Sequence, residues 1–181
     1  MHSAQEILTF WFAECTPEDW FSGDAAFDAR LAARFRETHA QVAAGEAFGW
    51  RATPEGRLAE IIVLDQFSRQ LYRGQGKAFA WDCMALTLAQ ELVARRDDET
   101  LTPVQRGFAY LPYMHSESAV IHKEAMRLFT GLGNEDQLKY EVAHAELIEK
   151  FGRYPMRNKA LGRVSTPEEE AYIASRDSGM F

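Results

Sequence analysis

Four Thr-Pro pairs punctuate this 181-residue chain, and they constrain its fold more than any other feature. The pairs are Thr16-Pro17, Thr53-Pro54, Thr102-Pro103 and Thr166-Pro167. Threonine can cap the first turn of a helix, and proline suits the first helical position. Glycines at positions 45, 74, 133 and 152 are typical of helix ends. No useful stretch shows the alternation that marks a half-buried strand. The punctuation therefore predicts an all-α chain without a sheet.

Between these signals the sequence predicts about eight helices. They are expected near residues 4–14, 24–44, 54–73, 77–96, 103–111, 116–131, 135–151 and 167–175. The longest polar break, around residues 95–102, is short enough to be a loop, so we expect one domain over residues 1–181. Consecutive helices with short connections can pack as antiparallel pairs around one core.

Composition excludes several classes of protein. The chain is 46% apolar, as globular proteins are, and no run approaches the roughly 20 apolar residues of a membrane-spanning helix. The N-terminus does not read as a secretory signal. A formal net charge of −7 argues against nucleic acid as a partner. Cys15 and Cys83 are too few for a disulfide framework, so a cytoplasmic location is expected.

The apolar stretch from residue 58 onward suddenly carries Asp65, Gln66, Arg69 and Arg73. At about 100° per residue these four fall on one side of a helix that is otherwise apolar in every direction. A buried carboxylate or guanidinium must be paired or must line a cavity. Two interpretations stay open. Asp65 and Arg69 can form an internal salt bridge four residues apart, or the arginines can bind a carboxylate or phosphate.

A second constellation is a basic run over residues 150–167 that contains no acidic residue. Its members are Lys150, Arg153, Arg157, Lys159 and Arg163. The run follows a helix stop and contains a proline, so we expect a shaped loop, and loops held by rigid helices are common places for sites. The alternative is that Arg157 and Asn158 satisfy helix-end carbonyls and surface acids.

Two histidines are candidate proton-transfer residues. His144 shares a helix face with large apolar residues, where a histidine is usually a hydrogen-bonded core residue. His115 lies at the start of a helix and, with Glu117, either helps to cap that helix or opens into a pocket. An imidazole near arginines suits general acid or base catalysis. His115 and His144 are therefore the catalytic candidates.

The remaining histidines give weaker evidence for a functional site than His115 and His144 do. His2, His39 and His122 look like surface residues. Glu141 and His144 have the spacing of half a di-iron motif, but such a site needs two motifs and further carboxylates. No set of side chains has a convincing metal spacing, so we expect no metal and no cofactor.

Several segments, in order along nearly the whole chain, resemble the bacterial domain-of-unknown-function family 924. They are residues 10–12, 20–28, 64–74, 110–117, 151–158, 161–163 and 165–169. The resemblance implies an all-helical fold of the tetratricopeptide-like superhelical type, and it implies no activity. The chain departs from the family pattern at Ser68, Gln70, His122 and Met156, where Pro, Asn, Gln and His are usual.

The candidate site that the resemblance implies consists of signature residues in these segments together with His144. They are Asp65, Gln66, Arg69, Arg73, His115, Glu117, His144, Arg153, Arg157 and Asn158. We hypothesise that they form a polar pocket for a small anionic ligand. Arg69, Arg73 and Arg157 would bind the anion, Asp65 would orient an arginine, and a histidine would transfer a proton. Their type and clustering leave open whether the protein is an enzyme.

A rival hypothesis is a helical module that binds a protein or peptide in a concave groove, as helical repeats do. It predicts an exposed aromatic or apolar groove in the first half of the chain. In that case the polar residues above would be a buried structural network. The oligomeric state is left open.

Overall fold

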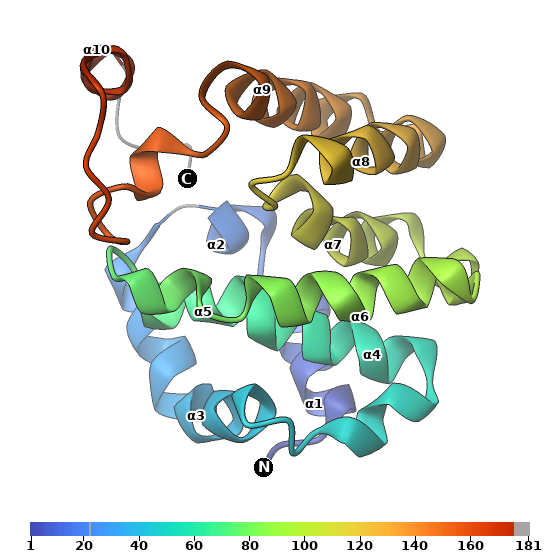
Figure 1. Ribbon diagram of the computed structural model, residues 1–181. Helices are drawn as coiled ribbons and strands as arrows, with labels where there is room; N and C mark the ends of the chain where they lie inside the picture. Colours follow the sequence, from blue (N-terminus) through green and yellow to red (C-terminus); the bar gives the residue numbers. More distant parts are fainter. Residues whose placement is uncertain (22, 176–181) are drawn as a thin grey trace.

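The computed structural model describes residues 1–21 and 23–175, and within them it contains helices and no strand. The all-α prediction is confirmed. The longer elements are α1 (Ala4–Thr9), α2 (Pro17–Phe21), α3 (Ala25–Ala43), α4 (Pro54–Ile62), α5 (Ser68–Leu71), α6 (Asp82–Ala94), α7 (Pro103–Met114), α8 (Ala119–Leu132), α9 (Glu135–Phe151) and α10 (Pro167–Ala174) (Figure 1). Residues 176–181 of the expected domain lie outside the described part of the chain.

The sequence predicts helix starts most accurately where a Thr-Pro pair marks them. Thr53 caps α4 by accepting a hydrogen bond from the Gly56 amide, and Thr102 and Thr166 form full capping boxes. The expected helix over 77–96 is wrong at its start, because residues 76–79 form a separate short 3-10 turn before α6. The short helix α2 was not expected.

α7 continues through Pro112 to Met114, beyond the expected end at residue 111. A proline inside a helix removes one backbone hydrogen bond. All residues of α7 from Gly107 onward are buried, and the helix packs on both α4 and α8. We attribute the continuation to this burial, which outweighs the missing hydrogen bond. α8 in turn begins at Ala119 rather than at residue 116.

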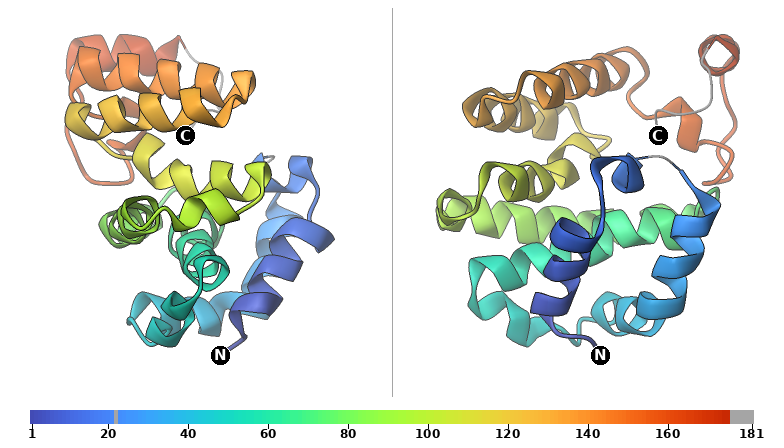
Figure 2. Two further views of the ribbon diagram at one scale, coloured as in Figure 1. Left: turned by 90° about the vertical axis from the view of Figure 1, so that its right-hand side faces the viewer. Right: turned by 180° about the vertical axis from the view of Figure 1, so that it is seen from behind.

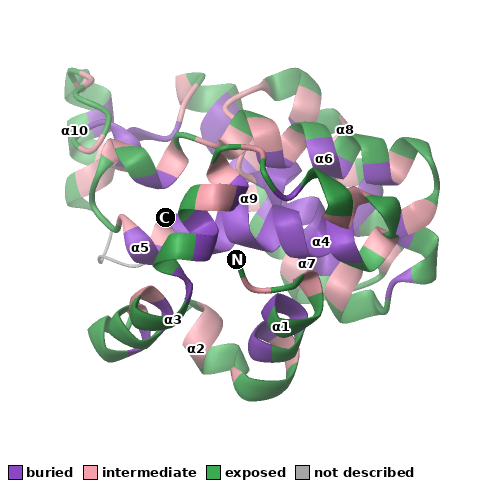
Figure 3. Cartoon of the chain, turned by 90° about the horizontal axis from the view of Figure 1, so that it is seen from below, coloured by how far each residue is buried: buried purple, intermediate pink, exposed green. Residues whose placement is uncertain are grey.

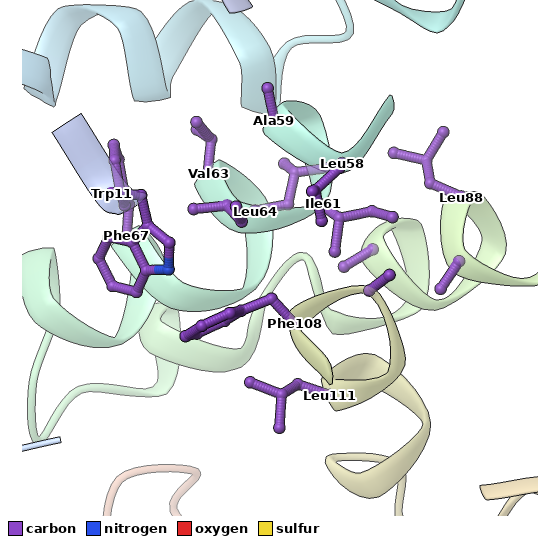
Figure 4. Packing of buried hydrophobic residues seen from close by; sticks show 14 of the residues in the cluster. Trp11, Leu58, Ala59, Ile61, Val63, Leu64, Phe67, Leu88, Phe108 and Leu111 are labelled. Carbon is purple, nitrogen blue, oxygen red and sulfur yellow. The ribbon is translucent and has the colours of Figure 1, made fainter. Parts of the chain in front are cut away.

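The central element is one continuous helix made of α4, a π-helical turn (Val63–Phe67) and α5. Every residue from position 56 to position 68 is buried, as the apolar surroundings of the polar residues predicted (Figure 3). Figure 4 shows Leu64 and Phe67 of this helix beside Trp11 and Phe108 in the main core. The polar residues of the π-helical turn, Asp65 and Gln66, therefore lie in a fully buried stretch of the chain.

The helices lie in layers around this central helix. Figures 1 and 2 show α8 and α9 at one end of the molecule and α1 and α3 at the other, with α4, α6 and α7 between. α7 packs on α8, and α8 on α9, through short connections, which makes them antiparallel neighbours. The tetratricopeptide-like arrangement stays a prediction. No helix in the described residues is both long and apolar enough to cross a membrane.

The segment after α9 forms a strap, defined here as residues 152–175. Gly152, with φ of 70°, ends α9 and turns the chain into it. Figure 1 shows the strap in orange and red, running from α9 toward α5 and then into α10. It has its own small apolar cluster, in which Tyr154 packs with Leu147 and Ile148 of α9. The basic run of the sequence lies largely in this strap.

Candidate functional site

Asp65 is the buried end of a polar cluster. It sits in the π-helical turn, only 1% exposed, and accepts hydrogen bonds from Gln66 and from Nδ1 of His115 at 2.8 Å. Nη1 of Arg69 lies 3.3 Å from the same carboxylate, as the four-residue spacing predicted. Burial opposes ionisation of Asp65, but Arg69 and His115 outweigh it and lower the pKa of the carboxyl. Asp65 is therefore a fixed anion at neutral pH.

Arg69 is held mainly by a residue that the sequence reasoning missed. Its guanidinium donates two parallel hydrogen bonds to Asp82 of α6, at 2.9 and 3.0 Å. It also donates to the carbonyls of Asp65 at 2.9 Å and Ala78 at 3.3 Å. No spacing rule could find Asp82, because it lies on another helix. Most hydrogen-bonding capacity of Arg69 is thus taken up by the protein itself.

Arg157 is buried, and most of its hydrogen-bond donors lack a protein partner within the described residues. The strap places its guanidinium between the rings of Phe79 and Tyr154, 4.6 and 4.5 Å from their centroids. The residue is 5% exposed, yet within the described part of the chain its side chain makes one long hydrogen bond, 3.4 Å from Nη1 to Asp82, and its buried Nε has no partner. Burial, with Arg69 nearby, lowers the pKa of Arg157 to about 10. The group stays cationic at neutral pH with donors to spare.

His115 faces Asp65 through Nδ1, and burial lowers its pKa although Asp65 opposes the shift. It is therefore largely neutral at pH 7, with its proton on Nδ1 and a lone pair on Nε2. The His144 ring lies 6.5 Å away, and its Nδ1 donates to the Tyr140 carbonyl at 2.7 Å. Burial lowers the pKa of His144 to about 3, so this ring is also neutral.

The other predicted residues lie around this cluster or apart from it. Glu117 accepts from the Tyr154 amide at 2.7 Å and pairs with Arg163 of the strap. Arg153 pairs with Glu169 within the strap, where Asn158 also donates to Glu169. Arg73 lies elsewhere and forms an ion pair with Asp28 of α3. The cluster proper consists of Asp65, Gln66, Arg69, Asp82, His115, His144 and Arg157.

Two histidines expected at the surface are buried, so that prediction is wrong. His39 is fully buried and its Nε2 lies 2.8 Å from the Ser68 hydroxyl. His122 is 3% exposed and its Nδ1 lies 2.7 Å from a carboxylate oxygen of Glu141. A buried histidine is tolerated when a partner accepts or donates a hydrogen bond. Both partners come from other helices, which a single-helix pattern does not reveal.

The cluster reaches solvent through partly exposed side chains of Arg69, Asp82 and His115. Two cavities of about 250 and 490 Å³ lie elsewhere, around Arg106 and around Trp20. Within the described residues, no three His, Cys, Asp or Glu side chains converge as metal ligands would.

Comparisons with known proteins give a family and a fold. The model of a family described as "Bacterial protein of unknown function (DUF924)" matches residues 7–177. The chain is similar to a solved structure of a protein of unknown function from Agrobacterium tumefaciens, with 37% identity and a TM-score of 0.90. The similarity covers 96% of this chain and 97% of that one. None of the curated proteins matches this chain.

Proposed function

The chain belongs to the bacterial family of unknown function DUF924, and we propose that its polar cluster binds a small anionic ligand at Arg157. The observation that carries the proposal is the buried Arg157 guanidinium with unused donors. A buried cation that lacks hydrogen-bond partners is unfavourable, and a carboxylate or phosphate would supply strong, charge-assisted ones. Asp82 alone supplies one weak contact at 3.4 Å.

The three arginines expected to bind the anion differ in what they can offer. Arg69 already donates to a carboxylate and two carbonyls, and Arg73 is paired with Asp28 away from the cluster. Arg157 is thus the anchor in this proposal, and Arg69 supplies positive charge beside it. Because the rings of Phe79 and Tyr154 lie against the Arg157 guanidinium, we place ligand contact at its unused N–H donors.

His115 is the group that could transfer a proton to or from the bound ligand. Asp65 holds Nδ1 of His115, and Gln66 and Arg69 hold Asp65 in turn. A carboxylate that fixes one imidazole nitrogen leaves the other as a base of defined tautomer. Nδ1 of His144 already donates a hydrogen bond to a backbone carbonyl. We therefore assign the role of base to His115 and treat His144 as a neutral polar side chain that lines the site.

A thermal-shift titration tests the binding proposal. Wild type and Arg157→Gln would be titrated with inorganic phosphate, acetate and malonate at constant ionic strength. Arg73→Gln is the matched control, because it removes the same charge outside the cluster. At 100 times Kd a ligand adds about 2.7 kcal/mol of stability, which raises Tm by several degrees.

The expected result is a saturable Tm increase in wild type and Arg73→Gln that disappears in Arg157→Gln. Two results contradict the proposal. One is that no anion raises Tm of the wild type beyond the effect of chloride. The other is that Arg157→Gln responds as the control does.

One observation favours the rival function, an interaction module. The 490 Å³ cavity is lined mainly by apolar side chains from both halves of the chain, and its rim includes Phe21 and Val104, which are 66% and 52% exposed. Exposed apolar patches often mark interaction sites. Fluorescence of an apolar dye would test this surface. Phe21→Ser should reduce dye binding, whereas Val120→Ser, which removes an exposed valine on α8, should not.

A further inference from the structure

A second buried polar pair lies beside the proposed site. His122 of α8 and Glu141 of α9 are 3% and 0% exposed, and Nδ1 of His122 lies 2.7 Å from Oε1 of Glu141. The pair contacts the cluster through Tyr154, whose hydroxyl lies 2.9 Å from Nε2 of His122 and whose ring stacks on Arg157. The sequence analysis placed neither His122 nor Glu141 in the candidate site.

The hydrogen-bond directions around Tyr154 are determined by its partners. The Tyr154 hydroxyl lies 2.5 Å from the carbonyl oxygen of Met114, which can only accept, so the hydroxyl proton points there. Nε2 of His122 lies 2.9 Å from the carbonyl oxygen of Ser116, which also can only accept. Nε2 therefore carries a hydrogen, which the Tyr154 oxygen can share as a second acceptor.

A proton must then also lie between His122 and Glu141. If Nε2 is protonated and the carboxyl is ionised, a bare Nδ1 lone pair would face an anion at 2.7 Å, which is repulsive. The pair is therefore either imidazolium with carboxylate or imidazole with carboxylic acid. In both forms it holds one shared proton and has no net charge. The buried Oε2 of Glu141 has no partner, which favours the carboxylic acid.

We infer that His122 and Glu141 are positioning residues that keep one shared proton and hold Tyr154 against Arg157. This inference rests on the proposed anion site for its effect on binding, but its statement about protons stands independently. The groups that face the pair from neighbouring elements are Tyr154 of the strap, His144 of α9 and two carbonyls at and just after the end of α7. None of these is an anion that could replace Glu141.

The test has two readouts. Nitrogen NMR of the His122 ring follows its protons directly, and titration with inorganic phosphate follows the Arg157 site. At pH 7 the His122 signals should show a hydrogen on Nε2 and a hydrogen bond between Nδ1 and Glu141. Glu141→Gln should leave them in the same neutral tautomer, because a Gln amide can donate to Nδ1 as a carboxylic acid does.

Tyr154→Phe keeps the ring on Arg157 but removes the hydroxyl that His122 holds. We expect about a tenfold weaker phosphate affinity, equivalent to one lost hydrogen bond. Glu141→Gln should stay within about twofold of wild type, since it preserves the hydrogen bond. Tyr140→Phe, which removes an exposed hydroxyl of α9, is the control and should match wild type.

The outcomes separate this inference from the proposed function. If the NMR signals show no hydrogen on Nε2 of His122, or no hydrogen bond between Nδ1 and Glu141, the shared proton is overturned. If Tyr154→Phe binds phosphate as wild type does, the positioning role is overturned. If wild type binds no phosphate, the anion site fails for that probe, and with it the effect on binding, while the NMR result still decides the shared proton.

Discussion

Asp82 balances the charges of the polar cluster, because among the described residues it is the one carboxylate that contacts both Arg69 and Arg157. Asp65 is more deeply buried, yet Arg69 would keep Asp82 and two carbonyls if Asp65 were removed. The contribution of each aspartate to the free energy of unfolding depends on which cations lose their partner when it is removed. How deeply the aspartate is buried does not by itself decide which contribution is larger.

Asp82→Ala should therefore destabilise the protein more than Asp65→Ala. Loss of Asp82 leaves two largely buried guanidinium groups short of a partner, which costs about 3 kcal/mol. Loss of Asp65 removes hydrogen bonds from His115 and Gln66 and costs about 1–2 kcal/mol. Urea unfolding of the two variants measures the difference. A larger loss in Asp65→Ala would contradict this ranking.

The stability of the protein should fall between pH 7 and pH 5 because of His144. Its folded pKa is about 3, and a histidine in the unfolded chain has a pKa near 6.5. Below 6.5 only the unfolded chain gains the proton, so acid favours unfolding by about 2 kcal/mol over this interval. The lowered pKa of Asp65 acts only at lower pH, where its contribution is lost as its carboxylate gains a proton.

His144→Gln should remove about 2 kcal/mol of the stability lost between pH 7 and pH 5, and urea unfolding at both pH values measures it. An unchanged slope in His144→Gln would show that His144 is not the group that titrates. His39, whose pKa burial lowers to about 4, adds a loss of similar size between pH 7 and pH 5, and that loss remains in His144→Gln.

At this scale the sequence reveals contacts within a helix and misses contacts between helices. The Asp65–Arg69 pair follows from a four-residue spacing and is present. Asp82 and the partners of His39 and His122 come from other helices, so their pairing depends on how the helices dock. The same limit explains Arg73, which shares a helix face with Arg69 but points to Asp28 of α3.

Among the elements, the central helix has a very close backbone contact at its start. Gly56 of α4 packs so closely on the preceding 3-10 turn (Phe48–Ala52) that an added Cβ would lie 2.0 Å from the Trp50 carbonyl oxygen. That neighbour is backbone and cannot rotate away. The start of α4 is thus fixed by both the Thr53 cap and this contact.

Gly56→Ala should destabilise the protein by about 3 kcal/mol, because the backbone of the 3-10 turn must shift. Gly131→Ala is the opposite case. Gly131 lies within α8 with nothing within 4 Å of the added carbon, so alanine should raise stability by about 0.5–1 kcal/mol. Thermal unfolding of both variants gives the two signs. A stabilising Gly56→Ala would show that the turn is free to move.

The sequence predicts element starts better than the irregular turns within elements. The Thr-Pro signals mark α4, α7 and α10 at the residue. The π-helical turn at Val63–Phe67 has no local signal of its own, although such turns often occur at functional sites. Its position in the core, where tertiary packing selects the backbone geometry, explains why a periodic pattern does not predict it.

At the scale of the whole molecule, the strap packs apart from the main core. Tyr154 packs in a small apolar cluster separate from the main one. The ion pair of Arg163 with Glu117 joins the strap to the connection between α7 and α8, whereas the pair of Arg153 with Glu169 lies within the strap. Segments with few buried apolar contacts open at lower free energy than the core. Because the strap carries Arg157, its opening would expose the proposed anion site.

Glu117→Gln should loosen the strap selectively. The change removes the charge that Arg163 pairs with and weakens the hydrogen bond from the Tyr154 amide. Because this ion pair is partly exposed, the global free energy of unfolding should fall by only about 1 kcal/mol. Amide hydrogen exchange in residues 152–165 should rise severalfold, while exchange in α4 stays close to wild type. Glu124→Gln, which breaks an exposed pair with Arg127 on α8, is the matched control. Uniform acceleration across α4 and the strap would mean that the strap unfolds only together with the core, and that Arg157 is permanently enclosed.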